Sequence, residues 1–120
     1  MLDMGYDYRK FEPVMISDVG KVLAIYDLTA GKIRAFWDRA AARDYIDIYA
    51  FLKTGTLNSE SLIDVLHYVR PEASLETFAT MLRQAPQYQE MYKGYGFDAR
   101  EISLLIQVLE KTATEIFPSE

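Results

Sequence analysis

Apolar side chains in the C-terminal part of this 120-residue chain recur at the spacing of one face of an α-helix. Asp98 and Glu101 precede them with the D-x-x-E spacing of a capping box, and Pro118 ends the pattern. The stripe consists of Ile102, Leu105, Ile106, Leu109, Ala113 and Ile116. Because a helix of this length is marginal alone in water, its apolar face must pack against other elements.

Two shorter helices are predicted in the middle of the chain by the same kind of signal. Asn58 and Ser59 precede one apolar stripe and Ser74 precedes the next, and these residue types are favoured N-caps. Prolines at positions 71 and 86 interrupt the two patterns. The two stripes are Leu62, Leu66 and Val69, and Leu75, Phe78 and Leu82.

Residues 27–55 predict two further helices in close succession. Asp27 is the expected N-cap of a helix that runs through Trp37. The stretch RAAARDYIDIYAFLKTG, residues 39–55, forms the next helix, and Gly55 is its expected C-terminal cap. A less regular segment at residues 87–97 is expected to form a short aromatic helix or a loop.

The N-terminal segment has a different pattern. FEPVMI (11–16) and KVLAI (21–25) are short apolar runs separated by the turn-rich SDVG, which predicts a β-hairpin with Pro13 at an edge. The expected fold is therefore mainly α, a short N-terminal β-hairpin followed by about five packed helices. It forms a single domain over residues 1–120, with a hairpin segment at 1–26 and a helical bundle at 27–120.

Composition excludes several function classes. The net charge of −5 argues against general nucleic-acid binding, and the absence of cysteine excludes disulfides and thiolate chemistry. No apolar run is long enough for a membrane span, and the charged start MLDMGYDYRKFEP is unlike a signal peptide, so we expect a cytoplasmic protein. His67 is expected to be structural, and Met81, Met91 and the tyrosines around them to belong to the core.

Four charged residues crowd the start of the 39–55 helix. Arg43 and Asp47 stand four residues apart, and Asp44 and Asp47 stand three apart on nearly the same helix face, so the arginines and aspartates can form surface ion pairs of low stabilising value. Asp47, between two isoleucines, is instead expected to be buried and to fix a cation. Lys32 and Arg39 are the cations nearest in the pattern. Together they favour a small pocket for an anionic oxygen ligand such as phosphate.

The segment DLTAGKIRAFWDRAAARDYIDIYAFL, residues 27–52, resembles a segment of the nucleotidyltransferase-like proteins of the AbiEii toxin family. The pattern places a lysine before R-x3-RD-x-x-D, and the resemblance covers about residues 1 to 55, with a helical tail beyond them. The residues in register are Lys32, Ala35, Arg39, Arg43, Asp44, Asp47 and Leu52.

The resemblance implies roles for these residues. Asp3, Lys32 and Asp47 fall at catalytic positions, and Lys32, Arg39, Arg43 and Asp44 at positions that bind the nucleotide. A nucleoside triphosphate and Mg²⁺ are the implied ligands. The family's metal-binding D-x-D pair after a glycine turn has no counterpart in this sequence, so we assign no metal ligands and expect no cofactor in the isolated chain. Because this chemistry needs metal-binding carboxylates, the chain is expected to be a truncated or partial enzyme that is inactive alone.

Two other interpretations remain open. The chain can be a helical interaction module that binds an antitoxin or a separate catalytic half, or the charges can serve only to tie helices together. A homodimer is also expected, because a lone hairpin has no sheet to join.

Overall fold

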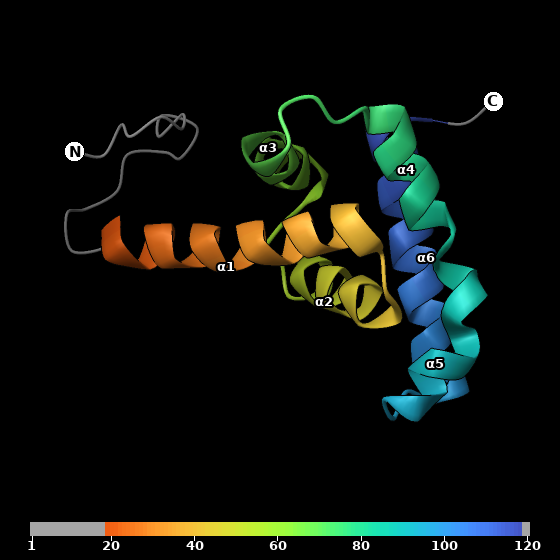
Figure 1. Cartoon of the computed structure of the whole chain (residues 1–120). Coiled ribbons are helices and arrows are strands. Elements are labelled where there is room, and N and C mark those ends of the chain that lie inside the picture. The colour runs from red at the N-terminus through yellow and green to blue at the C-terminus, as the bar shows by residue number, and fades with distance from the viewer. Residues whose placement is uncertain (1–18, 119–120) are drawn as a thin grey trace.

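The computed structural model describes residues 19–118, with side chains from residue 27 onward, and these residues are mainly helical. Figure 1 shows the helices in chain order. They are α1 (Val19–Arg39), α2 (Ala42–Lys53), α3 (Ser59–Val69), α4 (Leu75–Arg83), the 3-10 helix η3 (Ala85–Tyr88), α5 (Gln89–Gly94) and α6 (Ala99–Ile116). The predicted helical fold class is thus confirmed, and the aromatic segment at 87–97 supplies an additional short helix.

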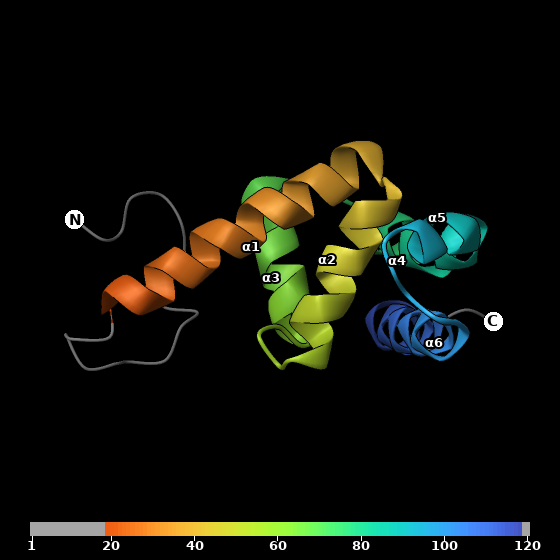
Figure 2. The ribbon, with the colours of Figure 1, turned by 90° about the horizontal axis from the view of Figure 1, so that it is seen from below.

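The helices form two packed groups that share one core. In one group α4 lies along α6, and in the other α1 crosses α2 and α3 (Figure 1). The view from below in Figure 2 shows α2 next to α6, which joins the two groups. Both views show the N-terminal turns of α1 extending past α2 and α3.

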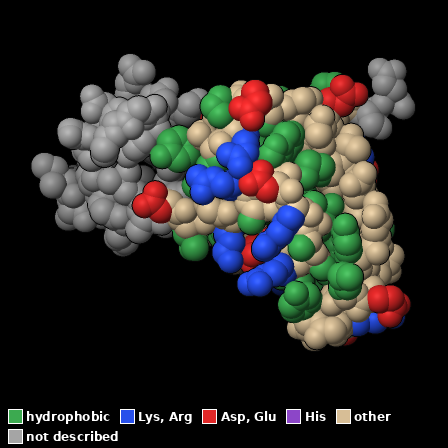
Figure 3. Space-filling view, viewed as in Figure 1, with side chains coloured by type: hydrophobic (Ala, Val, Ile, Leu, Met, Phe, Trp, Pro, Cys, Tyr) green, Lys and Arg blue, Asp and Glu red, His purple; other side chains and the backbone are tan. Residues whose placement is uncertain are grey.

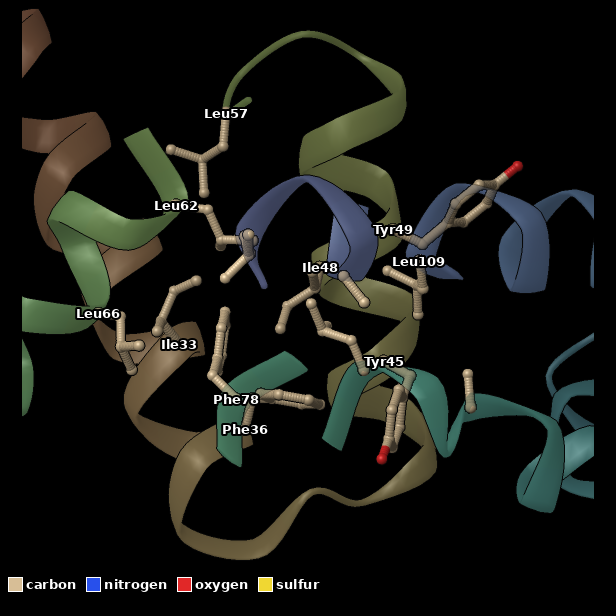
Figure 4. Packing of buried hydrophobic residues seen from close by; sticks show 14 of the residues in the cluster. Ile33, Phe36, Tyr45, Ile48, Tyr49, Leu57, Leu62, Leu66, Phe78 and Leu109 are labelled. Carbon is tan, nitrogen blue, oxygen red and sulfur yellow. The ribbon is translucent and has the colours of Figure 1, made fainter. Parts of the chain in front are cut away.

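Aromatic rings connect the two groups at the centre of the core (Figure 4). The ring of Phe36 on α1 meets Tyr45 on α2 edge-on, with centroids 4.9 Å apart, and Phe78 on α4 edge-on at 5.6 Å. Edge-on pairs of this kind add stabilisation beyond the apolar area they bury. The hydroxyl of Tyr45 donates to the main-chain oxygen of Met81 at 2.8 Å, so the buried phenol is satisfied.

Three of the predicted helix starts, those of α3, α4 and α6, are confirmed by capping hydrogen bonds. The Asn58 side chain accepts from the N–H of Ser61 at 2.9 Å, Ser74 from that of Thr77 at 3.2 Å, and Asp98 from that of Glu101 at 2.8 Å. Each bond satisfies a main-chain donor that the first turn leaves open. After α2, Gly55 has a φ of 81°, the left-handed conformation expected of a glycine there.

The predicted hairpin is wrong in its described part. Residues 21–25, expected as the second strand, lie inside α1, so Asp27 is an interior residue of that helix and not its N-cap. The run KVLAI continues the helical spacing of the residues that follow it, and a two-stranded hairpin without a sheet has little stability of its own. The first predicted strand, residues 11–16, lies outside the described residues. The sheet-edge reason for a homodimer therefore falls away.

Candidate functional site

The α1–α2 corner, residues 39–42, places the charged residues of the sequence pattern. Arg39 ends α1, Ala40 takes a left-handed φ of 48°, and α2 begins only at Ala42. Arg39 thus belongs to the C-terminal end of α1, where the helix dipole favours a cation, and not to the opening of the second helix as predicted. The corner brings the end of one helix against the start of the next.

Asp44 is the carboxylate that holds this corner. Its side chain is 1% exposed, and it accepts from Arg39 Nε at 2.9 Å, Arg39 Nη2 at 3.0 Å and the N–H of Ala41 at 2.9 Å. Burial alone would raise the pKa of Asp44, but the hydrogen bonds from Arg39 and Ala41, with the guanidinium charge, outweigh it and lower that pKa. Asp44 is therefore a charged, fully engaged group that fixes the position of Arg39.

Asp47 occupies a more open position than predicted. Its carboxylate lies 3.3 Å from Lys32 Nζ, and the two side chains are 30% and 38% exposed. The expectation that Asp47 is the buried carboxylate is wrong, because the corner turns Asp44 inward and leaves Asp47 at the surface between α1 and α2. The expected fixing of a cation by Asp47 is present, and that cation is Lys32.

Arg43 faces solvent in the first turn of α2. Among the described residues it makes no ion pair with Asp47, contrary to the predicted i,i+4 pairing. Its charge acts on Asp44 and helps to lower the pKa of that carboxyl. Of the three cations, Arg43 is therefore the one that forms no ion pair with another described residue.

These residues line one hollow between α1 and α2, which we call the basic hollow. Its volume is about 360 Å³. A Cβ added at Gly31 would meet nothing within 4 Å, so no neighbouring backbone approaches this glycine closely. The lining residues are Asp27, Leu28, Gly31, Lys32, Ala35, Arg39, Arg43, Asp44 and Asp47. The structure thus brings together every described residue of the predicted site, whereas Asp3 lies outside the described residues.

Asp27 and Leu28 were not predicted to belong to this lining, and Ala35 was predicted only as a residue in register with the family pattern. The spacing Asp27, Gly31, Ala35 and Arg39 is four residues at each step, which places all of them along one face of α1. That spacing could have predicted that Asp27 belongs to the site. The prediction was not made because Asp27 was assigned to a helix start.

The described part of the chain does not fit a resident divalent metal. No group of three or more His, Cys, Asp or Glu side chains is arranged there to hold one. Of the three carboxylates that line the basic hollow, Asp44 is paired with Arg39 and Asp47 with Lys32, and Asp27 is the third. Lys32, Arg39 and Arg43 are instead the groups in this hollow that an anionic ligand can contact.

Other candidate groups have structural roles. Nε2 of His67 lies 3.1 Å from the main-chain oxygen of Ala73, which agrees with the expected structural histidine. Met91 is 56% exposed, so its assignment to the core is wrong. None of the described helices has the length and apolar character that a bilayer span requires.

Comparison with known families gives a match for this chain. The family model described as "Nucleotidyl transferase AbiEii toxin, Type IV TA system" matches residues 9–111. The match therefore includes the helices beyond residue 55, which the sequence pattern had left as an unspecific tail. Searches of curated proteins and of solved structures found no match.

Proposed function

This chain belongs to the AbiEii family of nucleotidyltransferase toxins, and on that premise we propose that the basic hollow binds the phosphate groups of a nucleotide. The observation that carries the proposal is the convergence of Lys32, Arg39 and Arg43 on one hollow of about 360 Å³. Guanidinium groups match phosphate oxygens in geometry, and lysine adds a compact charge. A nucleotide-binding role also fits the cytoplasmic location expected from the sequence.

Each cation has a distinct relation to the ligand. Arg39 uses Nε and one Nη2 hydrogen on Asp44, and its remaining N–H groups have no acceptor among the described residues. Because the side chain is 55% exposed, these groups can donate to a phosphate oxygen. Asp44 is thus a positioning residue. Arg43, without an ion-pair partner among the described residues, can turn toward the ligand at little cost.

Asp47 positions Lys32 through an ion pair. At a separation of 3.3 Å and in a half-exposed setting, this pair contributes only a small stabilisation. A triphosphate carries more negative charge than one carboxylate, so it can draw the ammonium from Asp47 or share it. Asp47 holds the ammonium group of Lys32 at the hollow before the ligand binds.

We further propose that this chain contacts the nucleotide but does not transfer it unaided. Nucleotide transfer needs carboxylates that hold a metal ion, whereas Asp44 and Asp47 in the basic hollow are paired with cations and the described residues contain no group of three metal-ligating side chains. The sequence also has no D-x-D pair. Incubation of the purified chain with labelled nucleotide and Mg²⁺ should yield no labelled RNA or protein, and robust transfer would contradict this part of the proposal.

Calorimetric titration tests the binding proposal. The chain is titrated with each of the four ribonucleoside triphosphates in the presence of Mg²⁺, beside Lys32→Ala and the matched control Lys111→Ala. Lys111 lies on α6 and does not line the basic hollow. We expect Lys32→Ala to weaken binding and Lys111→Ala to leave it unchanged. Equal effects of the two variants would show that only overall charge matters and would contradict the proposal.

A second function, binding of a partner protein, is favoured by α1. Its N-terminal turns extend past α2 and α3, and Leu28 on this helix is 56% exposed (Figures 1 and 2). The family's type IV toxin–antitoxin description suggests an antitoxin as partner, and a separate catalytic half or a second copy of this chain would fit the same surface. Sedimentation of the wild type and Leu28→Asp tests self-association; a concentration-independent monomer mass for the wild type would rule out the second copy.

A further inference from the structure

The short helix α5 is fixed to the body of the protein by one face. Tyr92 is fully buried on this face, and its hydroxyl donates to the main-chain oxygen of Ala85 at 2.8 Å. Its ring packs near Phe97, with centroids 6.5 Å apart, and Phe97 in turn meets Tyr49 of α2 at 6.4 Å. These contacts hold α5 against α2 and give its other face a defined position.

The opposite face of α5 presents apolar surface to solvent. Met91 and Tyr95 are 56% and 57% exposed. They stand four residues apart, and the N–H of Tyr95 donates to the main-chain oxygen of Met91 at 3.3 Å, so the two side chains lie along one face. Tyr95 makes no ring contact with another described residue, unlike Tyr88, Tyr92 and Phe97. An uncovered tyrosine beside an uncovered methionine stands out in a segment whose other rings pack inward.

This apolar face lies beside the basic hollow. α5 packs against α2, one of the two helices that form the hollow, and Tyr95 has a small electrostatic influence on Arg39. Figure 3 shows lysine and arginine side chains grouped over α1 and α2, with hydrophobic side chains next to them toward α5. A flat aromatic group at the edge of a phosphate-binding hollow is the arrangement that a nucleotide needs, because the base offers a π-face to stack on and the phosphates offer charge.

We infer that Tyr95, with Met91 beside it, is the platform on which the base of the bound nucleotide stacks. The inference rests on the proposed binding of phosphates in the basic hollow and adds a specificity element to it. Arg39 joins the two parts of the site, since it interacts with Tyr95 and is fixed by Asp44. Stacking tolerates every base, so the platform should favour nucleotides over plain phosphates more than it favours one base over another.

Titration with two ligands distinguishes the contribution of the platform from that of the phosphate site. The full chain, Tyr95→Ala, Tyr95→Phe and the control Tyr68→Ala are each titrated with ATP and with inorganic triphosphate, both with Mg²⁺. Tyr68 is an exposed tyrosine on α3 that does not line the basic hollow. Thermal unfolding by circular dichroism checks that each variant is folded, and retention of the ring in Tyr95→Phe provides a second test if Tyr95→Ala is unstable.

The expected result is specific to the base. Tyr95→Ala should weaken ATP binding by roughly 5- to 150-fold and leave inorganic triphosphate binding unchanged, while Tyr95→Phe and Tyr68→Ala should bind both ligands like the wild type. Unchanged ATP binding in Tyr95→Ala would overturn the platform and leave the phosphate site standing. Equal weakening of both ligands would also overturn it. If the wild type binds neither ligand, the proposed function and this inference fail together.

Discussion

Substitution of Asp44 should destabilise the protein far more than substitution of Asp47. Asp44 is 1% exposed and accepts three hydrogen bonds, two of them from a charged guanidinium. Asp47 has one ion pair in a half-exposed setting. The sequence pattern alone predicted the opposite order, so this comparison tests the structure itself.

The magnitude follows from the contacts that Asp44→Ala removes. Loss of the bond to the Ala41 N–H at the start of α2 costs about 1 kcal/mol, as for other N-terminal caps. Loss of the charged bonds to Arg39 costs about 1.5 kcal/mol, the low end of the usual range, because the exposed guanidinium regains water. The free energy of unfolding should therefore fall by about 2–3 kcal/mol, against less than about 1 kcal/mol for Asp47→Ala.

Urea denaturation followed by circular dichroism measures both values, and thermal melts should show Asp44→Ala lower by about 10 °C. The pKa of Asp44 is lowered in the folded state, so its contribution to stability is present above the ordinary carboxyl pKa and is lost as the pH falls through the lowered one. The difference between wild type and Asp44→Asn should accordingly shrink below about pH 4. Equal destabilisation by the two alanine variants, or a pH-independent difference, would refute this reasoning.

Three further substitutions and one titration test the same structure. Ala40→Gly should raise the free energy of unfolding by up to about 1 kcal/mol, because Ala40 has a φ of 48° that glycine adopts without strain. Gly55→Ala should lower the free energy of unfolding by about 1 kcal/mol, because Gly55 has a φ of 81°. Urea midpoints of the two variants that move in the same direction would contradict both predictions. Tyr92→Phe should cost about 1 kcal/mol by leaving the Ala85 oxygen without its donor, and an unchanged melting temperature would count against that bond. Burial raises the pKa of Tyr45 and Tyr92, which favours their neutral forms at alkaline pH, so their phenolate absorbance should appear only as the helical signal is lost, and ionisation in the intact fold would disprove their burial.

Short local sequence patterns were sufficient to predict most of the helices. Asn58, Ser74 and Asp98 each cap a helix through a bond to a main-chain N–H three residues away, so a few neighbouring residues contain the whole interaction. The run KVLAI at 21–25 lacks such a local signal. An apolar run of that length fits a strand or a helix, and its position in α1 depends on the helical pattern that continues after it.

The site was predictable in its members but not in its geometry. The spacing of Lys32, Arg39 and Arg43 relative to the two aspartates indicated an anionic ligand, and all of them line one hollow. Which aspartate is buried depends on the left-handed conformation of Ala40, and nothing in an Ala-Ala-Ala run predicts that conformation. Tyr95, which we propose as the base platform, follows α5 and is more than fifty residues from Arg39 in the sequence, so no local pattern could have indicated that the two residues act together.

Nuclear magnetic resonance of the ¹⁵N-labelled chain during titration with a nucleoside triphosphate and Mg²⁺ tests the central claim most directly. The account predicts that the largest amide shifts fall on the residues of the basic hollow, around Lys32, Arg39 and Arg43, and extend to Tyr95. A second hollow between the end of α2 and α6, lined by Leu57, Ser59 and Lys111 among others, serves as an internal control. Shifts centred on that second hollow, or no shifts at millimolar nucleotide, would contradict the account.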